Sequence, residues 1–273
     1  MKENKLRTKH SGRRVLALAG IVAFFALIGA LVFAYGRLRD IWEEQCVVTD
    51  YAAQVTITDG RMVRADVIAG QFGIKNGANL AAIDFERRRR EIMEKIPNIR
   101  NIRITRHLPN RVEIDVEERV PVAKLGIKGR NDSSGRVVDT DGVVFISSSG
   151  TQMLPTIREG AAPGTQKGKK LTGMALSALR LVEMCRERFS ELAVIEADAS
   201  KPDYITIIRE DYIKAKIAWN GMEEPSDAML PSLVDKLDKL SKAISSNVDG
   251  SIREWDARQD GPVVYGNTMK EFL

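Results

Sequence analysis

Four carboxylates crowd one short stretch of this sequence, and that residue type at that density could do acid chemistry or hold a metal ion. The stretch is RHLPNRVEIDVEERVPVAKL, residues 106–125, and the acids are Glu113, Asp115, Glu117 and Glu118. Acid pairs that cleave glycosides, and carboxylate clusters that bind Ca²⁺, need side chains that converge from several elements. Here the first three acids alternate with Val112, Ile114 and Val116, which is the period of a strand with one packed and one wet face. We therefore expect a solvated strand face without catalytic residues or metal ligands.

Other groups that could do chemistry are scarce. The sequence has two histidines, His10 and His107, so the usual three-histidine metal site cannot form. The Ser-x-x-Lys, Ser-Asp-Asn and Lys-Thr-Gly motifs of penicillin-binding proteins are absent, and so is a Gly-x-Ser-x-Gly elbow. We predict that the protein is not an enzyme and needs no cofactor. A membrane-anchored cell-wall hydrolase that uses paired carboxylates stays open as the enzymatic alternative, because spacing does not show which acids converge.

The segment from Val15 to Tyr35 has no charged residue, and as a helix of about 31 Å it would match the hydrocarbon core of a membrane. Lysines and arginines concentrate in residues 1–14, directly before it. By the positive-inside rule, the short tail is cytoplasmic and the rest of the chain lies outside. A cleaved signal peptide is the alternative, but the apolar run is longer than a usual signal core.

The net charge of +5 does not require a nucleic-acid partner. Residues 1–14 hold six of the 42 basic residues and one of the 37 acidic residues, so the remaining chain is neutral. The run Arg87–Arg90 is the other basic cluster, and Glu86 with Arg90 forms a helical i,i+4 pair. We interpret this run as a solvated helix face, with a phosphate-binding patch as the alternative.

Two cysteines, Cys46 and Cys185, lie in the part of the chain expected outside the cytoplasm, where disulfides persist. They fall in different predicted domains and form no recognisable framework. The sequence is compatible with a disulfide between these two cysteines and with two free thiols.

The chain after the span begins with a strand, helix, helix, strand, strand pattern. Residues 55–58 alternate as a strand, 63–72 and 85–96 predict helices, and Pro97 ends the second helix. Leu108-Pro109-Asn110 then turns one strand into the acid-rich strand. These elements predict a small sheet with two helices on one face.

The following region predicts a separate β-rich domain. A hairpin signal lies at Asp141-Gly142, and YITIIRED and IKAKIAW predict further strands. Helices are expected at 173–190 and 229–246, with apolar stripes that pack on the core, a groove for a partner helix being the alternative. SIREWDARQ and PVVYG close the chain as strands, and a last strand commonly lies at a sheet edge that another chain can join.

The β-α-α-β-β order that ends in NIRNIRITRHLPNRVEIDVEERVPVAKL resembles the POTRA domain and following junction of the bacterial division family FtsQ, also called DivIB. In that family a strand, a Pro-containing turn, an alternating strand and a Glu-Arg-x-Pro-x-Ala motif follow one another. Here the motif is Glu118-Arg119-Val120-Pro121-Val122-Ala123. VVDTDGVVF at 137–145 is similar to the family's next hairpin, and Leu154-Pro155 resembles its Leu-Pro element. The resemblance covers nearly the whole chain.

This resemblance implies how the chain binds partners. In the family, the closing strands and the preceding helix bind a small single-span protein, FtsB, in complex with FtsL. By position Arg258 corresponds to the arginine that closes the penultimate strand, and the last strand carries Val263, Val264 and Tyr265; we predict that these four residues bind the partner. The family often has an aromatic residue after the arginine, where this chain has Gln259. Completion of the core is the alternative role of Val263 and Tyr265.

The expected fold class is α+β: one N-terminal transmembrane helix, a small POTRA-like domain, then a larger β-rich domain with helices. The expected boundaries are a basic tail at 1–14, a span at 15–35, a linker at 36–46, the POTRA-like domain at 47–118, the β-rich domain at 119–267 and a tail at 268–273. The expected function is a divisome scaffold in the inner (cytoplasmic) membrane that recruits or links division proteins at the septum. FtsB- and FtsL-like proteins are the expected partners, with other division proteins reached through the POTRA-like domain. A POTRA-bearing secretion component is a third class, but such proteins usually carry a series of ~10-residue transmembrane strands, which the sequence does not show.

Overall fold

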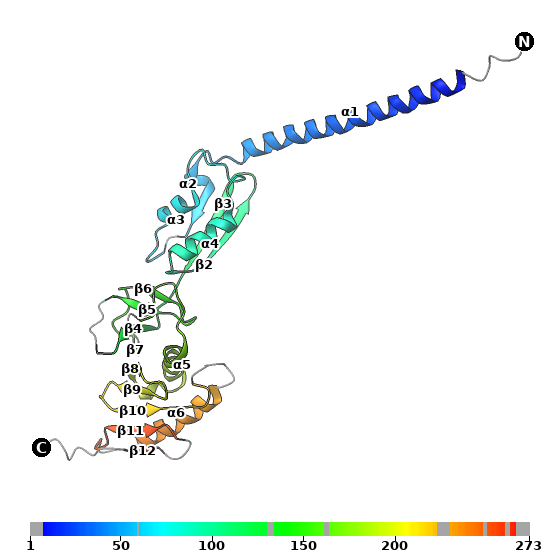
Figure 1. Ribbon diagram of the computed structural model, residues 1–273. Coiled ribbons are helices and arrows are strands. Elements are labelled where there is room, and N and C mark those ends of the chain that lie inside the picture. The colour runs from blue at the N-terminus through cyan, green and yellow to red at the C-terminus, as the bar shows by residue number, and fades with distance from the viewer. Residues whose placement is uncertain are drawn as a thin grey trace, which may run out of the picture. The chain divides into compact units, whose positions relative to one another are not determined.

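The computed structural model describes residues 8–58, 60–129, 134–160, 164–222, 230–247, 250–259 and 263–265 (Figure 1). The chain divides into two compact units. The first contains Met1–Gly60, Arg64–Arg90 and Ile102–Val116, and the second contains Arg61–Val63, Glu91–Asn101 and Glu117–Leu273. The expected α+β class, with an apolar amino-terminal helix and two sheets, is confirmed.

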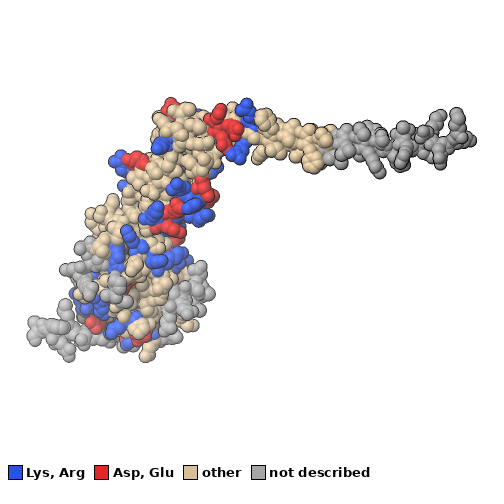
Figure 2. Space-filling view, turned by 45° about the horizontal axis from the view of Figure 1, so that its top comes forward, with Lys and Arg blue, Asp and Glu red and all other residues tan. Residues whose placement is uncertain are grey.

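The amino-terminal element is one long helix, α1 (Thr8–Gln45). Within the described residues, Val22–Gln45 is the one stretch long and apolar enough to cross a membrane. Its large side chains are exposed, with Phe24 at 60% and Phe33 at 69%, and Figure 2 shows the described middle stretch of the helix without charged side chains. Apolar side chains with no protein to pack against fit a single membrane span.

The helix does not stop where a polar linker is expected. Residues 36–45 are helical and continue α1 without a break. Arg39 and Glu43 form an i,i+4 ion pair of 2.8 Å in this stretch, and no proline interrupts it. The expected link is therefore the end of the long helix.

A three-stranded sheet with the order β1-β3-β2 forms most of the first unit, and the start of β2 and the end of β3 fall in the second unit. Strand β1 runs parallel to β3, with Val55 opposite Val112 and Ile57 opposite Ile114. The expected β-α-α-β-β order is confirmed, with one further short helix at the start. The elements are α2 (Tyr51–Gln54), β1 (Val55–Ile57), α3 (Ala65–Phe72), α4 (Phe85–Lys95), β2 (Ile99–His107) and β3 (Arg111–Glu118).

Apolar side chains from both helices and the sheet form the core of this unit. The rings of Phe72 on α3 and Phe85 on α4 lie 5.7 Å apart, and Val112 and Ile114 on β3 are fully buried. Burial of the apolar positions on β3 leaves the alternating acids on the outer face, as the period of two requires. The core therefore sets which face of β3 meets solvent.

The second unit contains a nine-stranded sheet with the order β12-β11-β10-β9-β8-β7-β4-β5-β6. Its strands are β4 (Ala123–Ile127), β5 (Arg136–Val138), β6 (Val144–Ile146), β7 (Thr156–Glu159), β8 (Val194–Ala199), β9 (Ile205–Arg209), β10 (Lys214–Ile217), β11 (Glu254–Ala257) and β12 (Val264–Tyr265). The hairpin expected at Asp141-Gly142 is confirmed, since β5 and β6 pair antiparallel across it. Strands β4, β7 and β8 run parallel, as do β10 and β11.

Two helices connect parallel neighbours in this sheet. α5 (Gly173–Arg188) crosses from β7 to β8, and α6 (Leu230–Ser245) crosses from β10 to β11, while the 3₁₀ turn η1 (Ser190–Leu192) follows α5. A parallel pair needs such a crossover because the chain must return to the end of the sheet where it started. The predicted helices at 173–190 and 229–246 are thus confirmed, within a sheet that is mixed.

Both helices pack on one face of the sheet. Alternating strand residues such as Ile207, Ala215 and Trp255 belong to one buried cluster together with Leu181 of α5 and Leu237 of α6. The intervening strand residues lie on the opposite face, where Arg158 pairs with Glu196 at 3.0 Å. The apolar helix stripes therefore form the core of their own domain, as expected.

Candidate partner-binding edge

The structure brings the predicted partner-binding residues together at one end of the nine-stranded sheet. Strand β12, which contains Val264 and Tyr265, is the edge strand beside β11, and Arg258 directly follows β11. Val263 is half-buried and packs against the core cluster. Within the described residues, β12 pairs with β11 alone. The prediction that the last strand lies at an edge is confirmed.

The register shows which backbone groups of β12 face outward. The Lys214 amide donates to the Arg253 carbonyl at 2.9 Å, so in the parallel pair the odd-numbered residues of β11 direct their backbone groups toward β10. Even-numbered residues, including Asp256, then face β12. Asp256 lies opposite Val264, so Val264 directs its amide and carbonyl toward β11. The backbone groups of Tyr265, one position on, point away from the sheet.

The opposite edge of the same sheet is closed. The Val144 amide of β6 donates to the Lys169 carbonyl at 2.9 Å, and its carbonyl accepts from the Gly168 amide at 2.7 Å. The Leu171 amide adds a bond to the Gly142 carbonyl at 2.8 Å. Residues 168–171 thus occupy the outward backbone groups of Val144, and the Asn98 side chain donates to the Ile146 carbonyl at 2.8 Å, so this edge is largely covered.

Arg258 is held in place beside the open edge. Its guanidinium pairs with Asp256 at 2.6 Å and lies 5.2 Å from the centre of the Tyr204 ring. The hydrogen bonds from Arg258 lower the pKa of Asp256 below its usual range, and the carboxylate in turn raises the pKa of Arg258. The arginine therefore presents a fixed positive charge at the end of β11, with 42% of its side chain exposed.

Lys236 on α6 also positions this sheet edge, and its role was not predicted from the sequence. It is 3% exposed, and its ammonium group donates to the Gln259 carbonyl in the turn between β11 and β12. A buried ammonium group needs such hydrogen bonds because desolvation disfavours its charge. The sequence pattern that could have indicated this role is a lysine among the inward-facing leucines of a helix, next to Leu233 and Leu237.

The acid-rich strand has separate partners for each carboxylate. Glu113 lies 3.6 Å from the His107 imidazole, Asp115 accepts from the Thr58 hydroxyl at 2.8 Å, and Glu117 lies 3.6 Å from an arginine. No group of three or more His, Cys, Asp or Glu side chains that could hold a metal ion occurs in the described part of the chain. The carboxylates of β3 therefore share a strand face and do not converge.

Glu118 and Arg119, which open the Glu-Arg-x-Pro-x-Ala motif, have a structural role. The Glu118 carboxylate accepts the backbone amides of residues 61–63 at 2.7 to 3.0 Å. Arg119 donates to the Pro97 carbonyl at 3.1 Å and to the buried Asp139 carboxylate at 2.5 Å. Asp139 in turn accepts the Val143 amide at 2.8 Å and so organises the β5–β6 turn. All of these groups belong to the second compact unit.

Both cysteines are free and buried. Burial raises the pKa of the Cys185 thiol to about 12, and the nearby Glu191 carboxylate acts in the same direction. A thiol with so high a pKa stays protonated and is a poor nucleophile at neutral pH. Cys185 is therefore a packing residue of α5.

Comparison with known proteins supports the family resemblance. Residues 52–119 match the family model "POTRA domain, FtsQ-type". The chain contains an FtsQ-type POTRA domain and is FtsQ-like. The match covers the β1-β3-β2 sheet with α3 and α4, and ends at Arg119, so the POTRA domain includes the first two residues of the Glu-Arg-x-Pro-x-Ala motif.

Similarity to a curated relative extends beyond the POTRA domain. The cell division protein FtsQ of Koribacter versatilis (strain Ellin345) is 21% identical over an alignment of 238 residues, and the alignment covers 83% of this chain. The chain covers 64% of the length of that relative. The β-rich region thus shares sequence with an FtsQ protein as well.

Proposed function

We propose that this protein is a membrane-anchored scaffold of bacterial cell division, which captures division proteins at the septum by strand addition to β12. The FtsQ-type POTRA domain and the similarity to a cell division protein support the process. The open β12 edge, on a sheet whose other edge is closed, is the observation that supports the mechanism. Unpaired backbone groups give affinity to an added strand, and neighbouring side chains give selectivity.

The proposed partners are proteins that resemble FtsB and FtsL, bound at the β12 edge. Arg258 lies beside this edge with its guanidinium fixed by Asp256 and Tyr204, so a partner meets a preorganised cation. Strand β2 is one of the two edge strands of the POTRA sheet, with β1 at the other edge, and offers a second edge for other division proteins. With a cytoplasmic amino terminus, α1 would hold both edges outside the cytoplasm.

Anchoring supports recruitment in this proposal. The single span restricts the outer domains to the membrane plane, which raises their effective concentration toward other anchored proteins. A weak strand-addition contact then suffices to assemble a complex. Catalysis by the scaffold is not part of the proposed mechanism.

The experiment that tests this proposal compares two substitutions at one position. Tyr265→Pro removes an outward amide donor from β12, while Tyr265→Ala changes the side chain and keeps that donor. We expect the proline variant to lose at least about tenfold in capture of an FtsB-like partner, because strand addition uses backbone groups. Co-purification of the full-length variants from membranes, with the partner quantified by mass spectrometry, measures the loss.

Thermal unfolding of both variants provides the control for folding. A folded Tyr265→Pro variant that captures the partner as well as Tyr265→Ala contradicts strand addition at β12. Equal losses in both variants point to side-chain recognition and equally contradict the backbone mechanism.

A further inference from the structure

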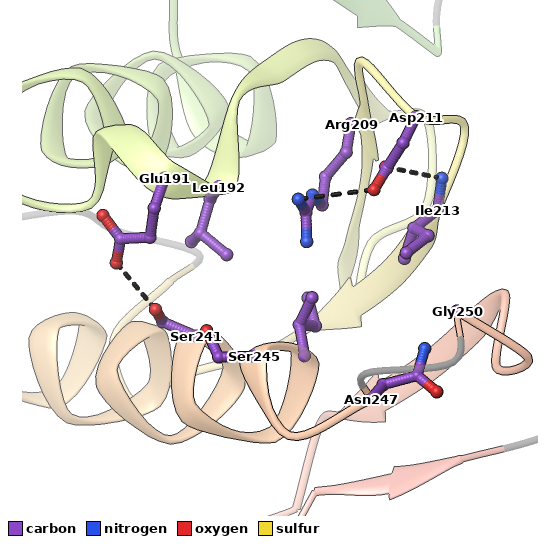
Figure 3. Close-up of a pocket in the computed structure, with 10 residues that line it drawn as sticks. Glu191, Leu192, Arg209, Asp211, Ile213, Ser241, Ser245, Asn247 and Gly250 are labelled. Carbon is purple, nitrogen blue, oxygen red and sulfur yellow. Dashed lines mark hydrogen bonds and ion pairs between the residues drawn. The ribbon is translucent and has the colours of Figure 1, made fainter.

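A cavity of about 240 Å³ opens in the second unit, and its described lining includes no residue of β12 (Figure 3). Its walls come from η1, from the turn between β9 and β10, and from the carboxyl-terminal half of α6 together with Asn247 and Gly250. Figure 3 shows Arg209 directed into the space between α6 and the β9–β10 turn. Neither the family resemblance nor the proposed scaffold role uses this cavity.

Arg209 gives the cavity a buried positive group. The side chain is 16% exposed, and its Nε atom is buried without a hydrogen-bond partner among the described residues. The one ion pair of its guanidinium in that part of the chain, from Nη2 to Asp211, is long at 3.4 Å. Buried guanidinium donors are stabilised by acceptors, and a carboxylate fits their planar fork best.

The same cavity also has negative groups. The Glu191 carboxylate lines it and accepts from the Ser241 hydroxyl at 2.6 Å, which uses one of its two oxygens. The carboxyl-terminal end of α6 borders the cavity at Ser245 and Asn247, and the last carbonyls of a helix carry partial negative charge. This side of the cavity favours a cation.

The floor of the cavity is apolar. Leu192, Ile213 and Ile244 line it and are 1%, 4% and 8% exposed. Aliphatic side chains of this kind bind a branched hydrocarbon group by removing it from water. The cavity thus combines three chemically distinct walls within a volume suited to a small molecule.

We propose that this cavity binds a free α-amino acid with an aliphatic side chain. The ligand's carboxylate bonds to the Nη groups of Arg209, its ammonium group faces Glu191, and its side chain packs on Leu192 and Ile244. The balance of charges selects a zwitterion, because Glu191 and Asp211 repel a simple anion and Arg209 repels a simple cation.

Calorimetric titration of the full-length chain in detergent tests the proposal with three probes. Leucine carries both charges, acetate carries only the carboxylate, and 3-methylbutylamine carries only the ammonium group with the same branched chain. We expect leucine to bind at least about tenfold more tightly than either single-charge probe. 3-Methylbutylamine lacks the carboxylate contact, and acetate lacks both the ammonium contact and the apolar contact. Equal affinity for acetate and leucine, or no leucine binding at about 10 mM, overturns the proposal.

Two substitutions assign the contacts, and a third is the control. Arg209→Lys keeps the charge but loses the guanidinium fork, and Glu191→Gln removes the negative charge from the opposite wall. The first is expected to weaken leucine binding by about tenfold. The second is expected to weaken leucine binding and to strengthen acetate binding, because the Glu191 carboxylate repels a simple anion. Arg158→Met, on the open face of β7, is the matched control and should leave leucine binding as it is.

Thermal unfolding shows which variants are folded. If Arg209→Lys does not fold, Glu191→Gln still decides the matter, because Glu191 lies on the surface turn η1. Leucine binding that is unchanged in a folded Glu191→Gln variant contradicts the proposed zwitterion site.

Discussion

Each edge strand of the nine-stranded sheet has outward backbone groups that no neighbouring strand pairs with, and the two edges differ in how these groups are covered. At the β6 edge, residues 168–171 bond to the backbone of residues 142–144, and a buried Arg119–Asp139 pair organises the adjoining turn. At the β12 edge, strand β12 has one described neighbour, β11, and the outward backbone groups of Tyr265 are directed away from it. Exposed strand edges invite association, so proteins normally cover them. Among the described residues one edge is open and the other is covered, and the open edge is where we propose that a partner binds.

Disruption of the closed edge should have the largest effect. Asp139→Ala leaves the Arg119 guanidinium, 13% exposed, without its buried partner and removes an acceptor from the β5–β6 turn. We expect the free energy of unfolding of the second unit to fall by about 3 kcal/mol, since removal of one member of a buried pair strands the other. Urea denaturation followed by tryptophan fluorescence measures this, because Trp219 and Trp255 are buried in that unit.

An exposed pair in the same unit is the matched control for this prediction. Asp235, 58% exposed, pairs with Lys239 one turn along α6. Asp235→Ala should cost about 0.5 kcal/mol or less, as is usual for surface pairs. Similar losses in the two variants would show that Asp139 does not hold the closed edge.

The open edge should loosen when its link to α6 is removed. Lys236→Met keeps the length of the side chain but loses the hydrogen bond to the Gln259 carbonyl. We expect amide hydrogen exchange in β11 and β12 to become about tenfold faster, with β9 unaffected, because a hydrogen bond from a charged donor contributes about 1.5 to 3 kcal/mol. Mass spectrometry of the exchanged full-length chain measures this.

Lys242→Met is the control variant for the hydrogen-exchange measurement. Lys242 lies on the same helix, pairs with Asp238 and is 75% exposed, so its loss should leave exchange unchanged. If β11 and β12 exchange at the parent rate in Lys236→Met, other contacts position the edge strand.

The smallest expected effect is a pH dependence of the free energy of unfolding, which comes from the Asp256–Arg258 pair at the end of β11. Because Arg258 lowers the pKa of Asp256 in the folded protein, the carboxylate stabilises the fold above its unfolded pKa of about 4. That contribution is lost as pH falls through the lower folded pKa. We expect the stability difference between the parent and Asp256→Asn to be present at pH 6 and to vanish under strongly acidic conditions, as urea denaturation at both pH values would show. A difference that is the same at pH 6 and in acid would rule out the ionised pair as its source.

Much of the local structure could be predicted from short-range patterns. Alternation of Val112 and Ile114 with acids identified β3 and its wet face, and an unbroken apolar run identified the span within α1. Asp141-Gly142 located the β5–β6 hairpin. Each of these signals depends on neighbours within a few positions, so no long-range contact is needed to interpret it.

The candidate site was only partly predictable. Arg258, Val263, Val264 and Tyr265 were placed by their position at the end of the chain and by resemblance, and the structure adds the direction of the backbone groups of Val264 and Tyr265. Lys236 was missed because its partner, the Gln259 carbonyl, lies 23 residues away and belongs to the main chain. A backbone carbonyl has no signature in the amino-acid sequence.

Sequence pattern alone therefore establishes the anchor, the helices with their apolar stripes and most strands, since these follow from local periodicity. Tertiary structure alone decides the order of the nine strands, the parallel pairing of β4, β7 and β8, and the cover over β6. Strand order and register arise from contacts between segments distant in the chain, and the alternation within one strand is the same whichever neighbour it takes. Whether an edge is open is a property of the assembled sheet.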